Sequence, residues 1–153
     1  MVERTSVTIP QAFELALQRH QAGRLAEAEA LYRQILAAQP NHSDALHLLG
    51  VIARQVGRHD LAMELIRRAL ALNPNNSAAL CDLGAACHAA GRLDEAITSY
   101  RRALELEPVY LLAQFNLAVA LAAGGQPDDA IVAYRRALEL KPGYAEAHLT
   151  SPR

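Results

Sequence analysis

The sequence predicts an all-α fold in which four similar helical hairpins stack into a solenoid. Apolar residues recur at the helical spacing of three and four positions, whereas alternation with a period of two is absent. The same residue types also recur with a step of 34 residues, which indicates a repeat architecture. Four prolines keep this step, Pro40, Pro74, Pro108 and Pro142, as do four glycines, Gly23, Gly57, Gly91 and Gly125.

The step divides the chain into repeats of two helices each. One apolar segment of helical length precedes each glycine, and a second lies between the glycine and the proline, so each repeat is expected to form a helix-turn-helix hairpin. We expect a polar leader at residues 1–8, repeats at 9–42, 43–76, 77–110 and 111–144, and a partial fifth repeat, a capping helix with a tail, at 145–153.

Each helix boundary has a local cause. Gly91 can adopt the positive φ that ends the first helix of the third repeat, and Asp94 then favours the positive end of the second helix. Pro74 cannot continue the helix before it. A serine just beyond the proline, Ser43 or Ser77, is expected to cap the next first helix.

Small residues recur where the two helices of a hairpin must approach closely. A single hairpin cannot bury its apolar stripe alone, so each repeat is expected to pack on the next one. The small residues of the first helices are Ala16, Gly50, Gly84 and Ala118, and those expected to face them are Ala28, Ala62, Ala96 and Ala130.

Composition limits the classes of partner and compartment. With 52% hydrophobic and 20% charged residues among 153, the chain can bury a core, and a net charge of -1 gives no field that would attract nucleic acid or a membrane. No apolar run is long enough for a membrane span, and the start lacks a secretory signal, so we expect a cytoplasmic protein. Cys81 and Cys87 are expected to be buried thiols in a reducing compartment.

The repeat resembles the tetratricopeptide repeat family, in the tandem form found in bacteria. The third repeat carries the family signature at Leu80, Leu83, Gly84, Gly91, Ala96, Tyr100, Ala103 and Pro108. The departures are Ala12 and Gln114 at a position that is usually large, and Ala16 and Ala118 in place of the glycine. The resemblance implies a right-handed α-α superhelix whose concave groove, lined by the first helices, receives a peptide or protein segment. It implies a protein-binding scaffold without catalytic residues or a cofactor.

The candidate groove residues are those of each first helix that point away from the hairpin partner. They form stacked rows, one repeat apart, that predict a groove with an apolar floor, a basic edge and scattered acidic groups. The predicted groove residues are Phe13, Leu17, His20, His47, Val51, Arg54, Cys81, Asp82, Ala85, His88, Phe115, Asn116 and Val119.

Two known specificities of the family can be compared with these positions. The clamp that captures the acidic carboxy-terminal tail of chaperones is disfavoured, because too few donors are present and Asp82 would repel a carboxylate. The asparagine ladder of O-linked N-acetylglucosamine transferases is matched only by Asn116, whereas Leu48 and Asp82 depart from it. This partial resemblance leaves a second hypothesis open: the chain is the substrate-recognition arm of a larger bacterial enzyme, whose catalytic domain lies outside it.

Other chemistries have weaker support. Cys81 and His88 lie seven apart, with His47 one repeat away, but the tight pairs of structural zinc sites do not occur, so we expect no metal site. No phosphate loop, nucleophile elbow or zinc-protease motif occurs. Recurring arginine pairs on the second helices are expected to form surface ion pairs rather than a nucleic-acid ladder. They are Arg67-Arg68, Arg101-Arg102 and Arg135-Arg136, near Glu64, Glu105 and Glu139.

The last repeat lacks a full successor, which leaves two alternatives. Either the short helix expected from residue 145 packs on Tyr134, Leu138 and Leu140, or the apolar end associates with a second copy of the chain. The abrupt end slightly favours a fragment of a longer protein.

Overall fold

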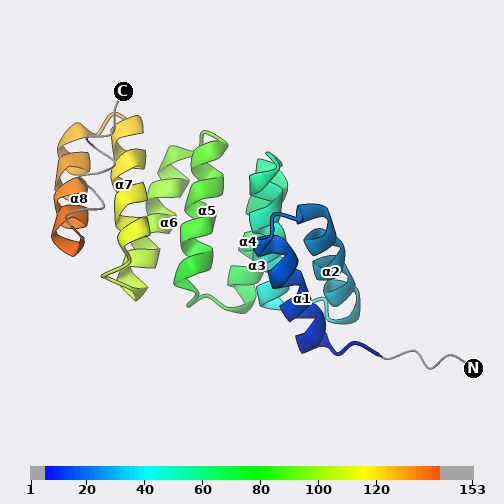
Figure 1. The fold of residues 1–153 in the computed structure, drawn as a ribbon. Coiled ribbons are helices and arrows are strands. Elements are labelled where there is room, and N and C mark those ends of the chain that lie inside the picture. The colour runs from blue at the N-terminus through cyan, green and yellow to red at the C-terminus, as the bar shows by residue number, and fades with distance from the viewer. Residues whose placement is uncertain (1–5, 142–153) are drawn as a thin grey trace, which may run out of the picture. The chain divides into compact units, whose positions relative to one another are not determined.

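A computed structural model describes residues 6–141, which form eight α-helices and no strand (Figure 1). The predicted all-α repeat fold is thereby confirmed. The predicted capping helix and tail at 145–153 lie outside the described residues. The first helices of the repeats are α1 (Ile9–Gln21), α3 (Ser43–Gln55), α5 (Ser77–Ala89) and α7 (Leu111–Ala123), and the second helices are α2 (Leu25–Ala38), α4 (His59–Leu72), α6 (Leu93–Leu106) and α8 (Pro127–Leu140).

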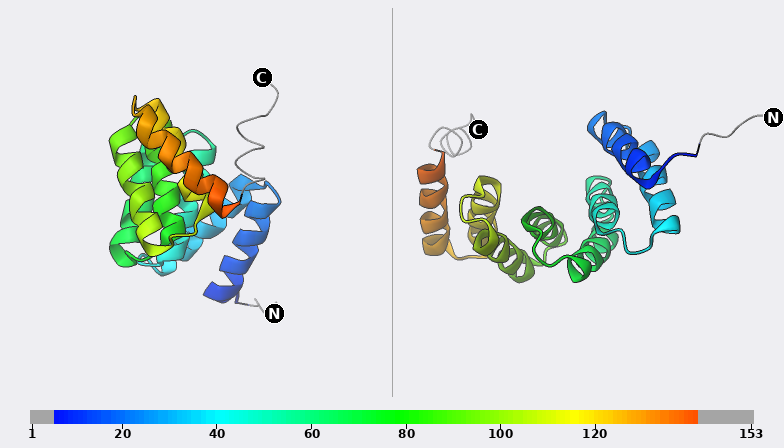
Figure 2. Two further views of the ribbon diagram at one scale, coloured as in Figure 1. Left: turned by 90° about the vertical axis from the view of Figure 1, so that its left-hand side faces the viewer. Right: turned by 90° about the horizontal axis from the view of Figure 1, so that it is seen from below.

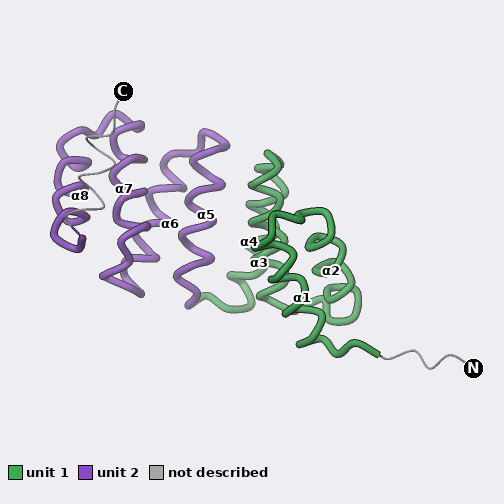
Figure 3. The backbone as a smooth tube through the Cα atoms, in the orientation of Figure 1, with its two compact units in different colours: residues 1–74 green, residues 75–153 purple. Residues whose placement is uncertain are grey.

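The chain divides into two compact units of two hairpins each (Figure 3). Unit 1 spans Met1–Pro74 and contains α1 to α4, and unit 2 spans Asn75–Arg153 and contains α5 to α8. Within unit 1, α2 packs against both α1 and α3, and within unit 2, α6 packs against both α5 and α7 (Figure 2). The second helix of one repeat therefore supports the first helix of the next. None of the described helices is long and apolar enough to cross a membrane.

The turn inside each hairpin is a Schellman motif centred on a glycine. Gly91 adopts a φ of 80°, its N–H donates to the His88 carbonyl at 2.9 Å, and the Arg92 N–H donates to the Cys87 carbonyl at 2.8 Å. The three equivalent glycines also have positive φ, as the sequence predicts. Asp94 lies in the first turn of α6, where the helix dipole favours its negative charge.

The residues that cap the first helices differ from the prediction. The N–H of Ala79 donates to Asn76 Oδ1 at 3.0 Å, and the N–H of Ala45 donates to His42 Nδ1 at 3.0 Å. Ser77 is already the first residue of α5, so the serine assignment was wrong by one position. The cause is the extended backbone of the preceding residue, because only that conformation aims a side chain back at the helix amides.

Buried apolar residues connect the helices within each unit. In unit 1, Tyr32, Ile35 and Leu46 are at most 1% exposed and belong to one cluster that extends to Leu65 on α4. In unit 2, Leu80, Tyr100 and Leu121 are buried to a similar degree. At roughly 1.5–3 kcal/mol for each large apolar side chain, this burial is the main stabilising contribution to each unit.

The predicted close approach of paired helices is confirmed in the second and third repeats. A Cβ placed on Gly50 would lie 2.6 Å from Ile66 Cγ1 and 3.2 Å from the carbonyl oxygen of Ala62. A Cβ on Gly84 would lie 2.6 Å from the Tyr100 ring. Glycine therefore lets the first helix come closer to the second than any other residue would.

Most of the expected ion pairs on the second helices do not form. Arg101 and Arg135 make no ion pair with any described residue, although Glu105 and Glu139 stand four positions later. The physical reason is that an exposed pair gains little in water and must order two long side chains. An i,i+4 pair of this kind does form on α2, between Arg33 and Glu29 at 3.2 Å.

Candidate functional site

The first helices of each unit carry the predicted groove residues. In unit 1 these residues come from α1 and α3, whose ends are joined by a hydrogen bond of 2.9 Å in which His20 Nε2 donates to Gln55 Oε1. In unit 2 they come from α5 and α7, which lie next to one another. Each unit therefore brings two first helices together, and we describe the surface of each unit by itself.

Phe13 and Phe115 lie largely between helices; together with His47 and Cys81 they form the first of the stacked rows, which we call the first row. The Phe13 ring lies 6.0 Å from the Tyr32 ring on α2 and 5.3 Å from the His42 ring before α3. In unit 2 the Phe115 ring lies 5.8 Å from the Tyr134 ring on α8 in an edge-on contact. These phenylalanines hold hairpins together, so replacing them would alter packing as well as any ligand contact.

Three further predicted residues expose little surface. Cys81 is 2% exposed, His47 is 7% exposed and Val51 is 9% exposed. The Tyr110 hydroxyl, just before α7, lies beside the Cys81 thiol. Burial raises the pKa of Tyr110 above its ordinary value, and the neighbouring Cys81 and Asp82 side chains act in the same direction. A ligand would touch these three positions only at their edges.

The other predicted residues are partly exposed and so can contact a ligand. Arg54 on α3 is notable because its Nε atom is buried and has no acceptor among the described residues. A buried guanidinium N–H without a partner is costly, and a ligand oxygen would satisfy it. Apart from Phe13 and Phe115, the partly exposed predicted residues are Leu17, His20, Arg54, Asp82, Ala85, His88, Asn116 and Val119.

Residues outside the prediction also shape these surfaces. His42 and Tyr110, two repeats apart, each precede a first helix and cover the first row of the repeat before it. Gln55 fixes the His20 ring. The sequence contains a signal for them, because His42 and Tyr110 are ring-bearing residues at equivalent positions of two repeats.

No group of three potential metal ligands is brought together in the part of the chain that the structure describes. Cys81 and His88 both lie on α5, but the Cys81 side chain contacts Tyr110. The thiol therefore has a structural explanation in the packing of α7 on α5.

Comparisons with known proteins identify the repeat family and the fold. A family model described as tetratricopeptide repeat matches residues 13–77, 53–110 and 88–145. A crystal structure of MamA is 28% identical, with a TM-score of 0.79, over 84% of this chain and 75% of that one. A MamA structure from Desulfovibrio magneticus RS-1 shares the fold at 18% identity, with a TM-score of 0.83, over 90% of this chain and 78% of that one.

One similar structure is an enzyme. A mutant of the O-GlcNAc transferase of Thermobaculum terrenum is 36% identical, with a TM-score of 0.73, over 79% of this chain. The matching region makes up only 23% of that enzyme. A search of curated proteins gave no match.

Proposed function

The chain belongs to the tetratricopeptide repeat family and is a protein-binding scaffold, and on that premise we propose that the partly exposed first-helix residues of each unit bind a peptide or protein segment. We call these residues the first-helix surface: Leu17, His20 and Arg54 in unit 1, and Asp82, Ala85, His88, Asn116 and Val119 in unit 2. The proposed role is binding without catalysis, in the cytoplasm, and requires no cofactor.

The observation that carries this proposal is the buried Nε of Arg54. Its N–H group has no acceptor among the described residues, although it is shielded from solvent. A peptide carbonyl or carboxylate placed beside α3 would accept this hydrogen bond and remove the penalty. Leu17, half-buried on the neighbouring first helix, would offer apolar contact to the same segment.

Unit 2 supports the same proposal with different chemistry. Asn116 is partly exposed, and its amide both donates and accepts hydrogen bonds, which matches the alternating groups of a peptide backbone. Ala85 and Val119 add small apolar contacts on the same two helices. The combination favours recognition of backbone and small apolar side chains over recognition of a highly charged tail.

The test is capture of a partner by purified chain from a lysate of the source organism, followed by titration of the identified partner. Arg54→Gln together with Asn116→Ala should weaken binding by at least about tenfold, since each removes a hydrogen bond of roughly 1 kcal/mol or more. The matched control is Arg102→Gln with Arg135→Gln, which changes exposed side chains on the second helices. Loss of binding in the control, with none in the test variant, would refute the proposal.

A second candidate is a recognition arm of a glycosyltransferase-like enzyme. The similarity to the Thermobaculum terrenum O-GlcNAc transferase favours it, together with Asn116 at a ladder position of that family. An antibody against this chain distinguishes the two candidates in a native lysate. A band of the chain's own mass supports the stand-alone scaffold, whereas a much larger band supports the recognition arm.

A further inference from the structure

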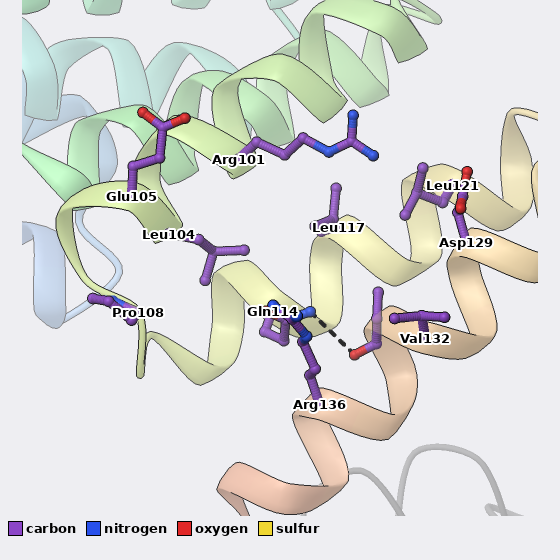
Figure 4. Close-up of a pocket in the computed structure, with 11 residues that line it drawn as sticks. Arg101, Leu104, Glu105, Pro108, Gln114, Leu117, Leu121, Asp129, Val132 and Arg136 are labelled. Carbon is purple, nitrogen blue, oxygen red and sulfur yellow. Dashed lines mark hydrogen bonds between the residues drawn. The ribbon is translucent and has the colours of Figure 1, made fainter.

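A cleft of about 440 Å³ opens in unit 2 where the second helices α6 and α8 flank α7 (Figure 4). Leu104 of α6, Leu117 of α7 and Ala133 of α8 give it an apolar lining, and Val132 beside them is 53% exposed. None of these residues belongs to the first-helix surface. The cleft is therefore a separate feature with its own chemistry.

Unit 1 contains a smaller counterpart of about 300 Å³ between α2 and α4. Leu65 occupies the position that Ala133 holds in unit 2, and the larger side chain reduces the space. Lining residues of the two clefts correspond two repeats apart, as in Arg33 and Arg101, Leu65 and Ala133, and Arg68 and Arg136.

Two arginines flank the apolar lining of the unit 2 cleft. Arg101 extends from α6 across the cleft, and Arg136 stands on α8 near Gln114 (Figure 4). Neither arginine forms an ion pair with a described residue, whereas Arg33 in the unit 1 cleft is paired with Glu29. The unit 2 cleft thus has two guanidinium groups available to an incoming ligand.

The carboxylates of the cleft do not cancel these groups. Asp129 lies in the first turn of α8, where the helix amides and dipole already stabilise its charge. Glu105 lies at the far edge of the cleft, with its carboxylate directed away from Leu117 (Figure 4). Neither carboxylate bonds to an arginine of the cleft.

Gln114 fixes the helices beneath this surface. It is 5% exposed, and its Nε2 donates to the Ala133 carbonyl at 3.2 Å, which ties α7 to α8. A buried hydrogen bond, as well as apolar contact, therefore fixes α7 and α8 at the base of the cleft. The surface is therefore largely preformed, and the chain would lose little conformational entropy when a ligand binds.

The chemistry of the cleft selects its occupant. An apolar lining favours leucine-like side chains, and guanidinium groups bind carboxylates through paired hydrogen bonds. The volume lies within the range of ligand sites but holds only a few side chains, so a folded domain cannot enter. A helix presents such side chains together at i, i+3, i+4 and i+7, with acidic residues beside them.

We propose that the unit 2 cleft docks an acidic amphipathic helix of a partner protein. Its apolar side chains cover Leu117 and Ala133, and its carboxylates bind Arg101 and Arg136. This docking uses no residue of the first-helix surface, so either binding activity can fail while the other remains.

The experiment titrates the full chain with a synthetic helical peptide that has leucines on one face and glutamates beside them. A second peptide replaces every glutamate by lysine. The double variant Arg101→Gln, Arg136→Gln should bind the acidic peptide at least about tenfold more weakly, because each change removes a charged hydrogen bond. The matched control, Arg102→Gln with Arg135→Gln, removes the same charge from the same two helices outside the cleft and should bind normally.

A second variant separates docking from folding. Ala133→Leu fills the cleft with a side chain that unit 1 already accommodates at Leu65, which is 6% exposed there. The Ala133→Leu variant should keep its helicity and should bind the acidic peptide several-fold more weakly. In the unsubstituted chain, labelled for NMR, adding the acidic peptide should change the chemical shifts of residues around Leu117 and Val132.

Several results would overturn the proposal. They are equal binding of the two peptides, equal loss in the test and control variants, or shift changes confined to the first-helix surface. Binding of dodecanoate to the cleft without any binding of the acidic peptide would assign the cleft to a small amphiphile instead. A dimer by light scattering that dissociates in the Arg101→Gln, Arg136→Gln variant would assign it to a second copy of the chain.

Discussion

Tyr110 lies beside Cys81, and this contact brings the residue before α7 against the first half of α5. His42 makes the corresponding contact in unit 1, where its ring lies 5.3 Å from that of Phe13. The residue before a first helix thus covers the first row of the preceding repeat. This relationship explains why Phe13 and Cys81 contact the repeat that follows them.

The reactivity of Cys81 tests this contact. Because Cys81 and Cys87 are 2% and 0% exposed, native protein should react slowly with a thiol reagent and denatured protein should react at once. Tyr110→Ala should raise the rate for one thiol several-fold, whereas Tyr110→Phe, which keeps the covering ring, should change it little. Equal rates in the two variants would show that Tyr110 does not shield Cys81.

Tyr32 should make the protein sensitive to alkali. Its side chain is fully buried, its hydroxyl has no partner among the described residues, and burial raises its pKa to about 12. A folded-state pKa above the unfolded value of 10.0 means that the folded state holds the proton more tightly. The contribution of protonated Tyr32 to the free energy of unfolding is therefore fully present below pH 10 and is lost as the pH rises towards 12.

Tyr32→Phe should therefore flatten the loss of stability between pH 10 and pH 12, measured by urea unfolding. At neutral pH it should stabilise the protein by about 1 kcal/mol, because a buried hydroxyl without a partner is removed. Tyr100→Phe is the matched control, since the Tyr100 hydroxyl is not among the buried atoms without a partner. A destabilised Tyr32→Phe would mean that the hydroxyl has a hydrogen bond in solution.

The helix caps give a third prediction. Asn76→Ala should reduce the free energy of unfolding by about 1 kcal/mol, because the Ala79 N–H loses its acceptor. Ser77→Ala, one residue later, should have almost no effect. Thermal unfolding of both variants checks the assignment. A larger loss of stability for Ser77→Ala than for Asn76→Ala would mean that Ser77 is the capping residue.

Gly50 gives a fourth prediction. Gly50→Ala should destabilise the protein by about 1–3 kcal/mol, because the new Cβ collides with Ile66 and approaches the Ala62 carbonyl. In an Ile66→Ala background the same change should cost less, since the side-chain collision is gone. An identical cost in both backgrounds would place the strain elsewhere.

The sequence predicts the helices of this protein better than its surfaces. The repeated glycines determine their turns locally, through a φ that few other residues adopt, so a pattern of residue types is sufficient to locate them. The cap at Asn76 depends on the backbone angles of one residue, which the pattern did not reveal. Helix boundaries are accordingly less predictable than helix existence.

The exposure of first-helix residues depends on neighbours that are distant in sequence. Cys81 and Asn116 both satisfy the first-helix pattern, yet Cys81 is covered by Tyr110 while Asn116 is partly exposed. The cleft between α6 and α8 is larger than its counterpart in unit 1, which has Leu65 at the position of Ala133. Such features arise from packing between repeats and cannot be obtained from the period of one repeat.

The most direct test of the proposed function places a photoreactive phenylalanine derivative at Leu17 or Val119, and at Arg102 as the control. Crosslinking of a captured partner, analysed by mass spectrometry, should yield adducts from positions 17 and 119 and none from position 102. Adducts from position 102, with none from the first-helix surface, would contradict the proposal that the first helices bind the partner.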